Sequence, residues 1–89
     1  MDKRTYNFKS FIELEDGRRA KMNRPFTIHT MRHDREAVFL QDNGELLIGY
    51  FDLLHEGVRG CEVCVLEDND PLKAHYIPSV DLKGWGYLG

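Results

Sequence analysis

Three residues that could transfer protons, Asp52, His55 and Glu56, lie close together in the chain. A carboxylate beside a histidine can act as a general acid–base pair. Catalysis would also need a nucleophile and an orienting group in the same pocket, yet serine occurs only at positions 10 and 79. Because a charged cluster after a strand is usually a solvated loop, we predict that the chain is not an enzyme. A small enzyme, the alternative, would act through these three residues.

Four residues with metal-binding side chains come in two pairs, His29 with His33 and Cys61 with Cys64. If residues 26–31 form an extended strand, the two histidines lie about 13 Å apart at ~3.3 Å per residue, which is too far for one ion. The cysteines are three positions apart, so a strand directs them to opposite faces. The helix that activates a thioredoxin-type CxxC is missing from the pattern. We therefore predict no metal, no redox role and no cofactor.

The basic segment, residues 18–35, could bind nucleic acid, because six Lys or Arg residues there are opposed only by Asp34. Phe26 and His29 lie among them, and cations beside exposed rings can follow a phosphate backbone and stack on bases. The net charge of −3 repels a polyanion outside this segment. RNA binding is thus an alternative function. Its residues would be Arg18, Arg19, Lys21, Arg24, Arg32 and Arg35.

Charge is divided unevenly along the chain. Residues 1–35 carry nine Lys or Arg against five Asp or Glu, whereas residues 36–89 carry three against ten. This polarity could mark two binding surfaces, or two faces that meet between subunits. The alternative is that the charges interleave in space and nearly cancel.

The elements that must position these residues belong to one small domain, residues 1–89. The composition, 42% hydrophobic and 11% aromatic, is sufficient for a folded core. No window approaches eighteen consecutive apolar residues, and no apolar stretch follows the basic N-terminus, so we predict no membrane segment and no signal peptide. Two cysteines in so short a chain fit a reducing compartment, and we predict a cytoplasmic location.

Two hairpins are predicted by dipeptides that end in glycine. Asp16-Gly17 favours a two-residue type I′ turn, and Asn43-Gly44 lies between the apolar runs AVFLQD and ELLIGYFDLL. Both faces of the second run are largely apolar. A glycine within such a strand, Gly49, indicates a sharp bend, a bulge or the close approach of another backbone. We interpret Gly49 as the corner of a small closed sheet.

The remaining segments are short and mostly extended. FTIHTM and CEVCVLED both predict strands, and DNDP predicts a turn between strands. The tail predicts a strand at residues 75–77, one helical turn with Ser79 as its N-cap, and a last strand around residues 85–88. The predicted fold class is therefore mostly β: a small barrel or strongly bent antiparallel sheet of five to seven strands, with at most one short helical turn.

Residues 36–66 resemble the first half of a small β-barrel of the Sm-like or SH3-like kind. A strand, a tight turn with Gly, a strongly bent strand with a second Gly and a Phe-Asp pair recur in that group, matched here by Gly44, Gly49, Phe51 and Asp52. The resemblance implies a barrel. It does not extend to Sm-type RNA binding, because Glu56 stands in place of an RNA-binding Asn. The later stretch YIPSVDLKGWGYL is similar to the closing strand of small bacterial barrel modules.

We predict a non-catalytic interaction module as the function. The module would bind a protein partner or a second copy of itself, as a homodimer, through an exposed strand edge or an aromatic patch. A small barrel that leaves aromatic residues partly exposed is expected to cover them by association. The candidate interface residues are Tyr50, Phe51, Trp85 and Tyr87.

Overall fold

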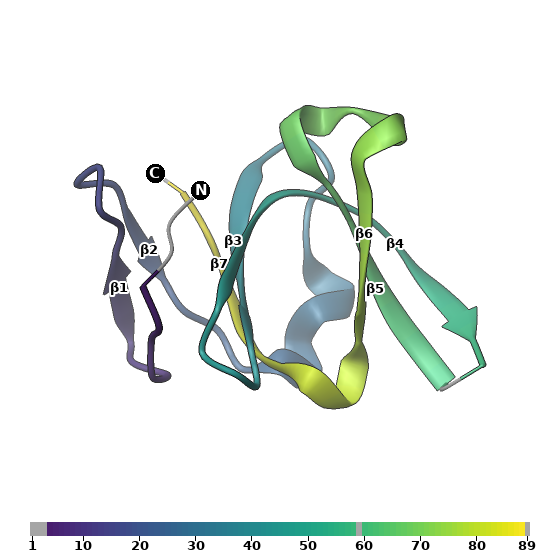
Figure 1. The fold of residues 1–89 in the computed structure, drawn as a ribbon, viewed down its shortest axis with the longest axis horizontal. Coiled ribbons are helices and arrows are strands. Elements are labelled where there is room, and N and C mark those ends of the chain that lie inside the picture. The colour runs from purple at the N-terminus through teal and green to yellow at the C-terminus, as the bar shows by residue number, and fades with distance from the viewer. Residues whose placement is uncertain (1–3, 59, 89) are drawn as a thin grey trace.

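The computed structural model describes residues 4–58 and 60–88, and these form seven strands in two antiparallel sheets (Figure 1). The smaller sheet pairs β1 (Phe11–Glu13) with β2 (Arg19–Lys21). The larger has the strand order β6-β5-β4-β3-β7. It contains β3 (Glu36–Gln41), β4 (Leu46–Gly57), β5 (Gly60–Leu66), β6 (Ala74–Pro78) and β7 (Leu82–Tyr87). The predicted mostly β fold is confirmed. None of the helical segments described could span a lipid bilayer.

Helical structure in the described residues is limited to short 3₁₀ segments. They are η1 (Pro25–Thr30), η2 (Glu67–Asn69), η3 (Pro71–Lys73) and η4 (Ser79–Asp81). The sequence predicts only the last of these. Its cap residue is Pro78, and no side chain caps it, so the prediction of Ser79 as N-cap is wrong.

The prediction that FTIHTM is a strand is also wrong, because this segment forms most of η1. Pro25 restrains the first residue to a helical φ. The hydroxyls of Thr27 and Thr30 each donate to the carbonyl three residues earlier at 2.7 Å, and such local bonds compete with strand pairing. The three-residue repeat of a 3₁₀ helix then directs Ile28 and Met31 to the same side, where both are buried.

Both predicted hairpins are present, but each closes through a three-residue loop rather than a two-residue type I′ turn. The glycine N–H donates to the carbonyl three residues earlier, at 3.0 Å for Gly17 and 2.9 Å for Gly44. Only the glycine of each loop has a positive φ, +88° and +87°. The side chains of Asp16 and Asn43 accept a backbone N–H from two residues later, at 3.0 Å in each loop. This pattern is typical of a type I turn followed by a left-handed glycine.

Strand β4 is the bent strand of the fold and arches across the molecule in Figure 1. Its first half pairs with β3 and its second half with β5, and Tyr50 is paired on both sides. The register with β5 shifts between Phe51 and Leu53, where the strand bulges. Gly49 lies just before this corner. A Cβ atom there would stand 2.6 Å from the carbonyl oxygen of Leu66, so β5 can approach β4 only over a glycine.

The larger sheet has an apolar layer on each face. On one face, residues of all five strands pack with η1 around Phe39, Phe51 and Trp85. The other face of β3 and of the first half of β4 is covered by the β1–β2 hairpin, through Ile12 and Ala20. The hairpin is also joined to β7, because Asn23 and Trp85 exchange backbone hydrogen bonds of 2.7 and 3.1 Å. The second half of β4, with β5 and β6, lies beyond this cover.

Candidate interaction surface

The uncovered side of β4, β5 and β6 forms what we call the outer face. Leu53, Cys64 and Tyr76 lie directly opposite one another across the three strands and therefore share this face. Leu53 and Tyr76 are 45% and 54% exposed, and Cys64 is buried between them. The same register places one further row of residues on each side of this central row. The outer face comprises Tyr50, Leu53, His55, Glu62, Cys64, Leu66, Ala74, Tyr76 and Pro78.

Strand β6 forms an edge of the larger sheet beside the outer face. It pairs with β5 on one side, and among the described residues no strand pairs with its other side. Its sequence, AHYIP, contains no Lys, Arg, Asp or Glu. Charged side chains, Lys above all, commonly protect such edges from pairing with another chain. Pro78, at the end of the strand, is a protective feature of this kind.

Burial and neighbouring groups keep the centre of the outer face uncharged. Burial raises the pKa of the Cys64 thiol, and the nearby carboxylate of Asp52 raises it further. The adjacent Cys64 in turn raises the pKa of the Tyr76 phenol. Both groups are therefore protonated at neutral pH. Cys61 and Cys64 are free thiols and point to opposite faces of β5.

The side chains of Asp52, His55 and Glu56 do not all lie on one face of β4. Asp52 lies at the bulge of β4, between the residues whose register shifts. His55 and Glu56 are successive strand residues and so point to opposite faces. The His55 ring packs against the ring of Tyr76, with centroids 5.7 Å apart. In this arrangement His55 belongs to the outer face.

Two of the four predicted interface aromatics are core residues. Phe51 is 5% exposed and Trp85 is 4% exposed, so the expectation that a small barrel leaves them partly exposed is wrong. The ring of His33 stacks on Phe51 with centroids 5.3 Å apart. The Trp85 indole N–H donates to the hydroxyl of Thr27 at 3.0 Å, so η1 covers the tryptophan. Tyr50 and Tyr87 are half-buried.

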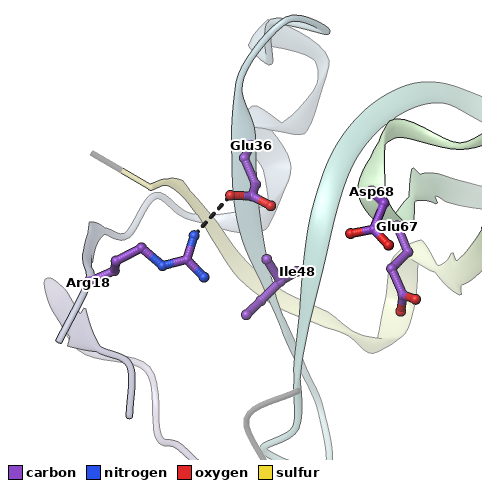
Figure 2. Close-up of a pocket in the computed structure, with 5 residues that line it drawn as sticks. All are labelled: Arg18, Glu36, Ile48, Glu67 and Asp68. Carbon is purple, nitrogen blue, oxygen red and sulfur yellow. Dashed lines mark hydrogen bonds and ion pairs between the residues drawn. The ribbon is translucent and has the colours of Figure 1, made fainter. Parts of the chain in front are cut away.

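Arg18 is engaged in a structural contact. Its guanidinium donates to Asp16 at 2.8 Å and to Glu36 at 2.9 Å, and so ties the β1–β2 hairpin to β3. Figure 2 shows this pair on one side of Ile48, in a hollow of about 390 Å³ whose other side carries Glu67 and Asp68. Within residues 4–58 and 60–88, no three acidic, His or Cys side chains are placed to hold a metal ion.

The other cations of the basic segment have three kinds of surroundings. Arg32 forms an ion pair with Asp34 at 2.8 Å. Three guanidinium groups lie over aromatic rings instead, at 4.2 to 5.4 Å from the ring centroids. These stacked pairs are Arg19 on Phe11, Arg24 on Phe8 and Arg35 on Tyr87. Lys21 is exposed. The six predicted nucleic-acid contacts therefore differ in their freedom to meet a phosphate.

Sequence analysis missed the outer-face residues Leu53 and Tyr76. A usable signal was the pair Leu53-Leu54, because two successive apolar residues in a strand cannot both face one core. It also missed that GWGYLG has the spacing of the GxGxxG nucleotide-binding pattern. That pattern opens a helix after a strand, whereas here Gly84 and Gly86 lie within β7.

Comparison with protein-family models, with curated proteins and with solved structures found no match for the chain.

Proposed function

We propose that the chain is a non-catalytic interaction module that forms a homodimer through the edge of β6. The observation that carries this proposal is strand β6, which contains no Lys, Arg, Asp or Glu, pairs on one side only among the described residues, and has exposed apolar side chains next to it. The unpaired N–H and C=O groups of such an edge can bind a strand of another chain. A protein partner that offers an extended segment would use the same edge.

Antiparallel pairing of two copies of β6 would create a two-fold dimer. Tyr76 is the middle residue of β6, so pairing centred on it places Tyr76 opposite Tyr76 of the second copy. An interface of this kind uses the same patch on both subunits. The two outer faces would then lie side by side as one sheet surface, with Tyr76 of each copy at its centre and Leu53 of each copy two strands away on β4. The Tyr76 phenol and Cys64 thiol are protonated at neutral pH, so neither adds a charge to the interface, although the carboxylates of Asp52 and Glu62 lie nearby.

The resemblance to Sm-like or SH3-like barrels is supported by the order of β3, the Gly44 turn and the bent strand β4 with Gly49. We infer from it a small bacterial barrel module.

A cytoplasmic location is supported by Cys61 and Cys64, because strand geometry separates them too far for a disulfide. Nucleic-acid binding has less support, because Arg18 and Arg32 of its six predicted contacts are already paired with carboxylates.

Light scattering behind a size-exclusion column tests the proposal. We expect a dimer at low and at high salt, because main-chain hydrogen bonds make the interface and β6 contains no Lys, Arg, Asp or Glu. Tyr76→Lys should yield a monomer, since a lysine on the edge strand opposes pairing. Phe26→Lys is the control: it replaces an aromatic residue on η1 that is more exposed than Tyr76, and it should leave the dimer intact. A wild-type monomer at every concentration, or a dimer unaffected by Tyr76→Lys, would overturn the proposal.

A further inference from the structure

A groove lies beside β7, at the opposite end of the strand order from β6. Its volume is about 420 Å³, and β2, η1, the loop before β3 and β7 all contribute to its walls. Two of its six lining residues are cations, two are aromatic, two are uncharged and polar, and none is acidic. They are Lys21, Asn23, Thr30, Arg35, Trp85 and Tyr87.

The two cations of the groove form no ion pair with a carboxylate of the described residues, although the charge of Arg35 contributes to lowering the pKa of the neighbouring Asp34. Arg18 and Arg32 each form at least one such ion pair. The walls of the groove contain no carboxylate that could compensate Lys21 and Arg35. The hollow of Figure 2, by contrast, is lined by three carboxylates and one arginine. The groove is therefore a local concentration of positive charge on a chain whose net charge is −3.

The guanidinium of Arg35 is held in position by a chain of contacts. It lies 4.2 Å from the centroid of the Tyr87 ring, within the range of a cation–π interaction. The Tyr87 hydroxyl accepts the backbone N–H of Arg32 at 2.8 Å, and its ring meets that of Trp85 edge-on at 5.2 Å. Trp85 is itself fixed by its indole hydrogen bond to Thr27. A guanidinium stacked on a fixed ring keeps its N–H edges available for an anion.

We propose that this groove binds the phosphate group of a small phosphorylated molecule. An arginine fork matches two phosphate oxygens, and a lysine adds a point charge. The groove is larger than a phosphate alone and lies within the range of about 300–1,000 Å³ typical of small-molecule sites. Trp85 is 4% exposed and Arg35 covers the Tyr87 ring, so a nucleobase finds little ring surface for stacking. Recognition therefore depends on the phosphate.

Titration of the full chain with inorganic phosphate, glucose 6-phosphate and glucose tests the proposal. Trp85 is the only tryptophan of the chain and lines the groove, so its emission reports binding directly. We expect both phosphates to change the emission and glucose to leave it unchanged. Tighter binding of glucose 6-phosphate would identify a phosphorylated small molecule as the source, and equal binding would identify free phosphate. The affinity should fall as sodium chloride is added.

Two substitutions in the groove and one outside it locate the site. Arg35→Gln should weaken phosphate binding by about 10- to 100-fold, the usual effect of losing a charged hydrogen-bond donor. Lys21→Gln should weaken it less. Arg32→Gln is the matched control, because Arg32 is paired with Asp34 and only its backbone contacts Tyr87; it should leave affinity unchanged. Tyr76→Lys should also bind normally, which separates this proposal from dimerisation.

Three results would overturn the proposal. The first is no change in Trp85 emission at millimolar phosphate, with amide chemical shifts of the groove residues also unmoved. The second is equal loss of affinity in Arg35→Gln and Arg32→Gln when circular dichroism shows both variants folded. The third is tight binding of a single-stranded oligonucleotide without binding of either phosphate, which would assign the groove to a polyanion instead.

Discussion

Replacement of Gly49 by alanine tests whether the corner of β4 depends on the close approach of β5. The backbone of Gly49 is ordinary for a strand, without a positive φ, so alanine has no backbone penalty there. Relief of the glycine entropy cost alone would stabilise the fold by about 0.5–1 kcal/mol. The new Cβ, however, would lie 2.6 Å from the Leu66 carbonyl oxygen and 2.8 Å from a methyl group of Val65. Overpacking of this kind costs about 1–3 kcal/mol.

The net prediction is a loss of about 1–2 kcal/mol in the free energy of unfolding, equivalent to roughly 5–15 °C in Tm for a chain of this size. Urea unfolding followed by emission of the buried Trp85 measures it. Gly57→Ala in the same strand is the matched control, because its Cβ would meet the flexible carboxylate of Glu62 rather than backbone. That variant should be within about 0.5 kcal/mol of wild type. A Gly49→Ala variant as stable as wild type, or more stable, would refute the steric argument.

Two further predictions concern titration and thiol reactivity. The backbone N–H and guanidinium of Arg18 hold the pKa of Asp16 below its ordinary value of 3.8, so this contribution to stability is present above 3.8 and is lost as pH falls through the lower folded-state pKa. In the Asp16→Asn variant, the free energy of unfolding should therefore fall less steeply below pH 3.8 than in wild type, as measured by urea titrations at several pH values. An equally steep fall in the variant would argue against this. Cys61 is half-exposed and should react with a colorimetric thiol reagent in the folded chain, whereas Cys64, buried and with a raised pKa, should react only in denaturant. Rapid reaction of folded Cys61→Ser would contradict the burial of Cys64.

Local sequence signals were sufficient for the fold class and for both hairpins. Asp16-Gly17 and Asn43-Gly44 mark turns because glycine takes a positive φ without strain, whatever the rest of the chain does. The loop type was not readable, because a two-residue and a three-residue loop both accept glycine at the left-handed position. FTIHTM was misread as a strand because its threonines are favourable in strands, yet their hydroxyls bond locally in η1.

Only the tertiary structure decided which candidate side chains are available for binding. The sequence showed six cations between residues 18 and 35. Arg32 pairs locally with Asp34, but Arg18 also pairs with Glu36 and Arg35 stacks on Tyr87, which are distant in the chain. The exposure of the candidate aromatic side chains also depends on distant segments, because His33 covers the ring of Phe51 and η1 covers the ring of Trp85.

The outer face likewise exists only because β4 exchanges one partner strand for another at its corner. Its first half is covered by the β1–β2 hairpin, and its second half carries Leu53 beside Tyr76 of β6. The alternation of side chains in each strand is a property of the sequence. Packing between strands that are far apart in the chain determines which of the two faces is buried in the core and which is exposed to solvent.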